Sequence, residues 1–258
     1  MKKNIIIALL ISLISSEYLQ GQNLNPLEHM PFGKVKSIKV KYSILDSFIM
    51  TENEETVMDN YYVEYDINGV FSKKEFYSKG GKVIINIKAQ VNWRDGKLIA
   101  KDYFVILDEP VKKEIFIYDD NGTIIACTEY NQHGGEMSNT TYTYNDKKQL
   151  IEAKTKAKGK EYSETKEYKY NDKDISTFYY PPNNSDTPES ILQCTKNSQG
   201  DILERRYTKS AISDTPQITT YEYEYDDNNN WIKQTSYKDG KSYLSAEREI
   251  EYYENAEE

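Results

Sequence analysis

The chain contains few of the residues that most often build catalytic or metal centres. Its 258 residues include two cysteines and two histidines. A zinc site needs about four such ligands at short spacings, whereas Cys127 and Cys194 lie far apart in the chain. We therefore predict no metal site and no cofactor. We expect both cysteines to be buried free thiols, with a single disulfide between them as the alternative.

Familiar catalytic motifs are also missing. The sequence has no HExxH, no nucleophile elbow and no phosphate-binding glycine loop. Residues 163–166 match an S-x-x-K pattern, but they lie in a strand-like stretch where that spacing gives no helical geometry. His133 lies in a hairpin loop, where a solvated role is the simpler interpretation. We predict that the protein is not an enzyme, and an enzyme built on loops such as 179–190 is the weakest alternative.

Positive charge is scarce relative to negative charge. The chain has 33 Lys and Arg residues against 42 Asp and Glu residues, which gives a formal net charge of −9. A field of this sign repels phosphate groups, and no basic cluster offsets it. Nucleic acid is therefore excluded as an expected partner.

Long apolar runs are absent beyond the first residues. Lys2 and Lys3 precede the largely apolar run 5–14, which is too short to cross a bilayer and is typical of a signal peptide. We predict a signal peptide over 1–21 and an extracytoplasmic location, whether periplasm, cell surface or secreted. No transmembrane segment would remain after its removal. An uncleaved anchor or a buried helix are the alternatives for this segment.

Tyrosine, by contrast, is abundant and recurs at regular spacing. The chain has 24 tyrosines, and several of them stand immediately before a turn. The anchors that precede a turn are Tyr65, Trp93, Tyr118, Tyr144, Tyr170, Lys196 and Tyr225. Successive anchors are about 26 residues apart, and a regular period of this length is the signature of a repeat architecture.

Each unit follows the same pattern of strand, tight turn and strand. Residues at spacing two, such as Tyr223 and Tyr225, share one face, and mostly polar residues alternate with them. The turn is clearest at 119–122, where Asp119 and Gly122 suit the first and fourth positions of a type I turn. In other units, Asp66 and Asp226 hold the position of Asp119, and Gly69 holds the position of Gly122.

These units predict an all-β fold. We expect a single domain over 22–258, with about seven tandem antiparallel hairpins, clearest over 61–253, that form a twisted, curled sheet enclosing the aromatic face. Prolines within 179–190 predict a long loop inside this domain. An outer-membrane barrel is a rival, because alternating strands and a signal peptide fit one, but tyrosine-dominated faces offer little apolar band for lipid.

The Tyr-Asp-x-x-Gly core at 63–69 and 116–122 resembles the YD repeat of Rhs-type proteins, in particular the short secreted YD-like repeat proteins of Bacteroidetes. The resemblance implies a β-repeat fold and an extracytoplasmic setting, and it carries over no catalytic residue. The chain departs from the family at Val70, Thr123 and Asp201, where Rhs repeats typically carry Arg or Asn. It also has too few repeats to form a shell around a C-terminal toxin.

Exposed aromatic residues are the best candidates for function. Trp93 and Trp231 lie in or beside turns, where an indole face could stack on a sugar ring or anchor a partner protein; the alternative is that both fill core positions. The Asp- and Asn-rich turns lack the spaced carboxylates of a calcium loop. We predict a non-catalytic binding module of the cell envelope, for a glycan or an envelope protein. A purely structural or assembly scaffold without a small ligand is the alternative.

Overall fold

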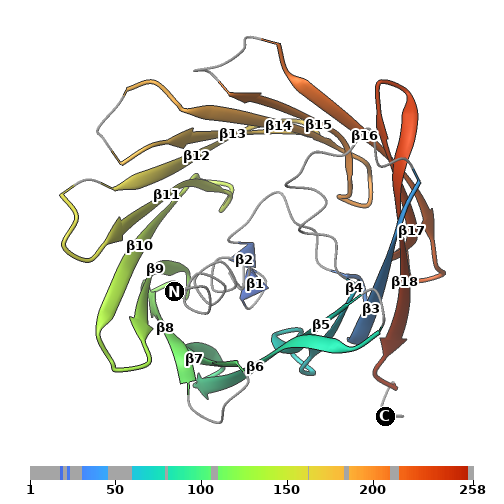
Figure 1. Ribbon diagram of the computed structural model, residues 1–258. Helices are drawn as coiled ribbons and strands as arrows, with labels where there is room; N and C mark the ends of the chain where they lie inside the picture. The colour runs from blue at the N-terminus through green and yellow to red at the C-terminus, as the bar shows by residue number, and fades with distance from the viewer. Residues whose placement is uncertain are drawn as a thin grey trace.

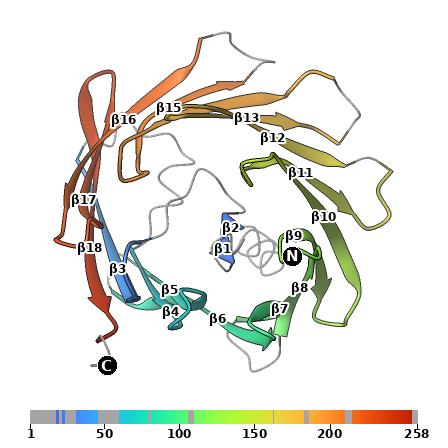
Figure 2. The same cartoon turned by 180° about the vertical axis from the view of Figure 1, so that it is seen from behind.

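The computed structural model shows a closed β-barrel in which sixteen strands, β3 to β18, each pair antiparallel with their neighbours (Figure 1). The ring closes where β18 pairs with β3, and the same ring is seen from behind in Figure 2. The expectation of a curled sheet is therefore wrong, although the all-β hairpin pattern is present. Closure removes both edges of the sheet, which would otherwise expose unpaired backbone groups.

The structure describes only part of the chain. The described residues are 18–19, 22–23, 31–45, 60–78, 81–105, 110–161, 163–182, 186–209 and 215–254. The predicted signal peptide, 1–21, lies outside them except for Tyr18–Leu19. No helix in the described ranges is long and apolar enough to cross a membrane.

The barrel strands follow one another around the ring in chain order. Their bounds are β3 (Val35–Ile44), β4 (Asn60–Tyr65), β5 (Phe71–Tyr77), β6 (Val83–Arg94), β7 (Lys97–Val105), β8 (Pro110–Tyr118), β9 (Ile124–Asn131), β10 (Glu136–Tyr144), β11 (Leu150–Ala157), β12 (Glu164–Asn171), β13 (Asp174–Tyr180), β14 (Ser190–Lys196), β15 (Ile202–Lys209), β16 (Gln217–Tyr225), β17 (Trp231–Lys238) and β18 (Lys241–Tyr252). Two short strands, β1 (Tyr18–Leu19) and β2 (Gln22–Asn23), pair with each other. The proline-containing segment lies between β13 and β14, which form a hairpin.

The seven predicted turns all lie at one rim of the barrel, which we call the turn end. In the first of them, Oδ1 of Asp66 accepts hydrogen bonds from the backbone N–H groups of Asn68 and Val70 at 2.9 and 2.8 Å. The same pair of bonds recurs at Asp119, Asn145, Asn197 and Asp226. In these five turns the side chain adds to the backbone ladder, which explains why Asp or Asn follows the anchor there.

The anchor tyrosines connect each hairpin to the one before it. The hydroxyl of Tyr118 donates to the carbonyl of Leu98 at 2.7 Å, and that of Tyr144 donates to the carbonyl of Ile124 at 2.9 Å. Tyr170 donates to Leu150 in the same way at 2.8 Å. A half-buried ring supplies apolar contact while its hydroxyl satisfies a backbone carbonyl, a combination that phenylalanine cannot supply.

The strand pair that closes the ring is an eighth copy of the unit, divided between two distant parts of the chain. Tyr252 pairs with Val35 beside a β-bulge, as Tyr225 pairs with Trp231 in the seventh turn. The N–H of Tyr253 donates to the carbonyl of Lys34 at 2.8 Å, and Gly33 has a φ of 76°. The sequence prediction of about seven repeats therefore missed one.

Asn230 forms hydrogen bonds to both sides of this closing strand pair, and we expect its replacement to lower the stability of the barrel. Asn230 is buried, with 3% of its surface exposed. Its side-chain oxygen accepts a hydrogen bond from the N–H of Phe32 at 2.6 Å. Its side-chain nitrogen donates to the carbonyl of Phe32 at 2.9 Å and to the hydroxyl of Tyr252 at 2.8 Å. Asn230→Ala removes these three hydrogen bonds and should lower the free energy of unfolding by about 2 kcal/mol, measured by denaturant titration. Thr123→Ala changes the same turn position in the third unit, and an equal loss there would contradict a special role for Asn230.

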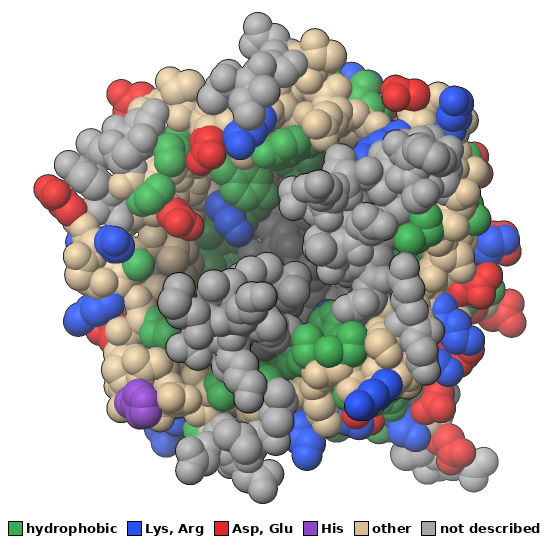
Figure 3. Space-filling model, viewed as in Figure 1, with side chains coloured by type: hydrophobic (Ala, Val, Ile, Leu, Met, Phe, Trp, Pro, Cys, Tyr) green, Lys and Arg blue, Asp and Glu red, His purple; other side chains and the backbone are tan. Residues whose placement is uncertain are grey.

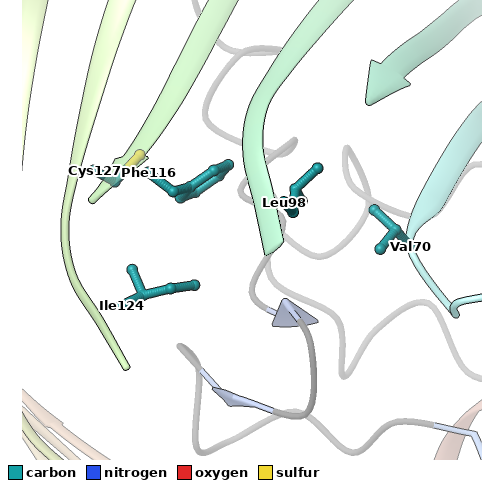
Figure 4. Close-up of a cluster of buried hydrophobic side chains, with 5 residues drawn as sticks. All are labelled: Val70, Leu98, Phe116, Ile124 and Cys127. Carbon is teal, nitrogen blue, oxygen red and sulfur yellow. The ribbon is translucent and has the colours of Figure 1, made fainter. Parts of the chain in front are cut away.

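Apolar and aromatic residues line the inner wall. One cluster joins Val70, Leu98, Phe116, Ile124 and Cys127 from successive hairpins (Figure 4). Both cysteines are buried and free, as predicted, and burial raises the pKa of the Cys127 thiol. This cluster therefore passes from hairpin to hairpin along the inner wall.

The outer wall carries charged pairs between strands. Glu249 on β18 pairs with Lys39 at 3.2 Å and with Lys41 at 3.1 Å, and all three side chains are exposed. Lys233 pairs with Glu224 at 2.9 Å on the neighbouring hairpin. Viewed along the barrel axis, charged side chains gather on the outer surface and hydrophobic side chains gather on the inner rim (Figure 3). Ion pairs of this kind differ from the apolar band that a lipid-facing barrel turns outward.

Candidate functional site

A cavity of about 820 Å³ lies at the turn end, over four successive units. Its walls come from the third to the sixth turns and from the strand ends beside them, which the hairpin ladders hold in place. Two smaller hollows, of about 580 and 430 Å³, lie over strand faces on the outer wall. The turn-end cavity is the largest of the three and the one built by the repeat itself.

Two anchor tyrosines line this cavity. Their hydroxyls are already bound to the carbonyls of Ile124 and Leu150, so Tyr144 and Tyr170 cannot rotate freely. Burial raises the pKa of Tyr170 to about 12, and burial together with the charge of Asp119 raises the pKa of Tyr144 further. Both rings therefore remain neutral at physiological pH.

Side-chain amides supply fixed polar groups around the rings. Nδ2 of Asn145 donates to Oε1 of Gln149 at 2.9 Å, and Nδ2 of Asn197 donates to the hydroxyl of Tyr225 at 2.6 Å. Gln149, Asn197 and Gln199 all line the cavity. These groups offer both donors and acceptors to a polar ligand without needing to be ordered first.

The charge of the cavity is opposite to that of the chain. Three lysines line it, Lys148, Lys173 and Lys196, against one carboxylate, Asp172. The chain as a whole carries a net charge of −9. A concave site of this sign attracts anionic groups that the remaining surface repels.

A second polar group lies on the inner wall, between β7 and β10. Glu114 accepts from the hydroxyl of Tyr103 at 2.7 Å and pairs with Lys112 at 2.9 Å, and Ser138 donates to Glu129 at 2.8 Å. Burial lowers the pKa of Lys112, but the carboxylates of Glu114 and Glu129 outweigh burial and raise it. These groups satisfy one another's hydrogen bonds and leave few donors or acceptors for a ligand.

Lys101 lies beside this network, but its amine lacks a hydrogen-bond partner among the residues that the structure describes. Its residue is fully buried, and Nζ makes no hydrogen bond within the described part of the chain. It lies 5.3 Å from the ring centroid of Phe71 and 5.5 Å from that of Tyr103. Burial lowers the pKa of Lys101 to about 8, although Glu114 opposes the shift.

The predicted tryptophans lie on the inner wall, away from the turn-end cavity. Trp93 packs against the cluster of Val70, Leu98 and Phe116. Trp231 lies beneath the guanidinium of Arg248, whose Cζ is 3.3 Å from the ring centroid. Neither is among the described residues that line the cavity, whereas the signature residues Tyr144, Tyr170 and Gly122 are.

Sequence reasoning missed the lysines of the cavity. One signal was present in the alignment of turns: Lys148 occupies the position held by Gly69, Gly122 and Asn229 in other units. Within the described residues, no group of three or more His, Cys, Asp or Glu side chains could hold a metal ion.

Comparisons with known proteins support the barrel fold. A porin-like protein from Bacteroides uniformis ATCC 8492 has a similar structure, with a TM-score of 0.54 and 15% identity over 86% of this chain and 98% of that one. At this identity the likeness shows the fold alone. No protein-family model matches the chain, and no curated protein does.

Two other solved structures give weaker likenesses. A porin-like protein from Bacteroides vulgatus ATCC 8482 has a TM-score of 0.41 and 11% identity, over 86% of this chain and 99% of that one. A TcdB2-TccC3-TEV chain has a TM-score of 0.28 and 13% identity, over 72% of this chain and 13% of that one.

Proposed function

We propose that the protein is a non-catalytic, extracytoplasmic binding barrel that holds a glycan in its turn-end cavity. The observation that carries this proposal is the cavity itself: about 820 Å³, lined by two fixed tyrosine rings, side-chain amides and lysines. Small-molecule sites typically have volumes of about 300–1,000 Å³. The cavity accommodates a few sugar residues.

The shape and chemistry of the cavity favour a glycan over an envelope protein. Stable protein–protein interfaces bury about 800 Å² on each partner, usually across a broad surface. This site is instead concave, and its amides and hydroxyl-bearing rings suit a ligand rich in hydroxyl groups.

The lining residues also argue against catalysis. Glycoside hydrolysis normally requires a pair of carboxylates, whereas Asp172 is the single carboxylate among the described lining residues. Histidine and cysteine, the other common general bases and nucleophiles, are likewise not among those residues. The donors present can bind and orient a sugar without cleaving it.

The proposed location follows from the first residues and from the outer wall. The segment 1–21 has the pattern of a signal peptide. Exposed ion pairs such as Lys39–Glu249 and Lys233–Glu224 suit water rather than lipid around the barrel. We therefore place the barrel in an aqueous compartment outside the cytoplasm, with its ligand site at one rim.

A cavity-filling substitution tests this function. Ser198 is exposed and lines the cavity, so Ser198→Trp should abolish saturable glycan binding measured by calorimetry over a panel of polysaccharides. Ile67→Trp places the same side chain at the same position of the first turn, outside the cavity, and should keep full affinity. Absence of binding by the parent protein to every polysaccharide would favour the scaffold alternative. Loss of binding in Trp231→Ala but not in Ser198→Trp would move the site to the inner wall.

A further inference from the structure

Lys148 occupies a backbone position that disfavours it. Its φ is 60°, in the left-handed region where the equivalent positions of other turns carry Gly69, Gly122, Gly200 or Asn229. A side chain with a Cβ is strained there, and lysine has no short polar group to offset the cost, unlike asparagine. Selection for turn stability alone would therefore favour glycine at this position.

The turn itself gives no reason for a lysine. The N–H of Lys148 donates to the carbonyl of Asn145 at 2.9 Å, and the N–H of Gly122 makes the same bond in its own turn at 3.1 Å. No ion pair of Lys148 is present among the described residues. Strained backbone that local structure does not require is typical of functional sites.

The position of Lys148 supplies that reason, because Lys148 lines the cavity together with Lys173 and Lys196. Lysine ammonium groups are compact point charges that bind oxyanions such as carboxylate, sulfate and phosphate. The three amines come from the fourth, fifth and sixth units, so they follow the curve of the rim. A polymer with repeated acidic groups would meet them in succession.

We infer that the ligand of the cavity is an acidic glycan, bearing carboxylate or sulfate groups, and that Lys148, Lys173 and Lys196 bind these groups. This inference rests on the proposed function and narrows it to one class of polysaccharide. Tyr144 and Tyr170 hold the sugar rings, and the lysines select their charge. The net charge of −9 disfavours the binding of acidic polymers elsewhere on the chain.

Two matched pairs of polymers test the charge requirement. The full-length protein is titrated with polygalacturonate and its methyl ester, and with dextran sulfate and dextran. We expect saturable binding to the charged member of at least one pair and none to either neutral member. That binding should weaken as NaCl is raised from about 0.05 M to about 0.5 M, because salt screens exposed charges.

Two glycine substitutions separate the role of Lys148 from turn stability. Lys148→Gly should weaken binding of the charged polymer about tenfold, the value of one charge-assisted bond, while its melting temperature stays the same or rises. Asn229→Gly relieves the same left-handed position in the seventh turn, away from the cavity. It should leave affinity unchanged, and Lys148→Arg should retain most of it.

The outcomes of these experiments distinguish the inference of an acidic ligand from the proposed function of glycan binding. Equal binding of charged and neutral members would overturn the inference and leave a glycan-binding function standing. Binding of charged polymers that Lys148→Gly does not weaken would place the anion site elsewhere and also overturn it. Absence of binding by all four polymers, and by the wider panel tested with Ser198→Trp, would remove both proposals.

Discussion

Joining residue 254 to residue 32 by a peptide bond is expected to raise the free energy of unfolding by up to about 5 kcal/mol. The joint would create the segment Tyr252-Tyr253-Glu254-Phe32-Gly33-Lys34-Val35, which has the same length as the seventh turn from Tyr225 to Trp231. Cyclisation removes the entropy that the unfolded chain gains from free ends, and the estimate follows from closing a loop of roughly two hundred residues.

The native geometry is already prepared for this joint. Tyr253 donates to Lys34 at 2.8 Å, as Asp226 donates to Asn230 at 2.9 Å in the seventh turn. Gly33 has the positive φ that the fourth turn residue needs, so the new turn adds little strain. Tyr253 also donates its hydroxyl to the carbonyl of Tyr65 at 2.7 Å, which holds the C-terminal side of the joint against the first hairpin.

The measurement compares intein-cyclised 32–254 with the linear chain of the same residues by denaturant titration. A third form, cyclised through a flexible linker of about eight extra residues, is the control for turn geometry. The short joint should be at least as stable as the long one if the ends form a true eighth turn. A short-jointed ring that is no more stable than the linear chain would show that the ends meet with a different geometry.

The hairpins of this fold could be predicted from local pattern, whereas closure could not. Alternation around Tyr223 and the Asp and Gly signature at 119–122 specify strands and turns within a few residues of each anchor. Whether a sheet closes depends on strand number, tilt and stagger summed around the ring, which no single hairpin encodes. The eighth unit was nevertheless visible, because Tyr252 follows Tyr225 at the spacing of the repeat.

The candidate site was harder to predict because it belongs to several turns together. Trp93 and Trp231 stood out by residue type, yet the register places both on the inner wall beside apolar clusters. Lys148 stood out only by its place in the turn alignment, where glycine or asparagine was expected. Its proximity to Lys173 and Lys196 depends on how the ring brings consecutive turns onto one rim, which is a tertiary property.

Replacing the buried Lys101 by methionine is expected to stabilise the barrel by about 3 kcal/mol near pH 7. Burial lowers the pKa of Lys101 from 10.5 to about 8, because Nζ has lost its water and makes no hydrogen bond among the described residues, and the nearby Glu114 offsets only part of this cost. The unfolded chain therefore binds the proton more tightly than the folded chain. Methionine fills a similar volume and carries no charge to desolvate.

The sign of the pH dependence separates this cause from simple repacking. Below pH 8 Lys101 is protonated in both the folded and the unfolded state, so the folded state carries the full cost of burying the charge. Between pH 8 and 10.5 Lys101 is neutral in the folded state but still protonated in the unfolded state. The cost of burial to the folding free energy therefore declines over this range. The charged groups near it are Glu114, Asp66 and Lys112, and all of them remain in the variant. The gain from Lys101→Met should thus fall from about 3 kcal/mol near pH 7 to about 1.5 kcal/mol near pH 9.5.

Denaturant titrations of both proteins at several pH values provide the measurement, with Lys88→Met as the control. Lys88 is exposed on β6, so its replacement should change stability by less than about 0.5 kcal/mol at every pH. A gain from Lys101→Met that does not vary with pH would mean that improved packing, rather than the buried amine, is its source. A loss of stability would mean that the amine has a partner in solution, because an unpaired buried ammonium cannot stabilise the fold against a methionine of similar size.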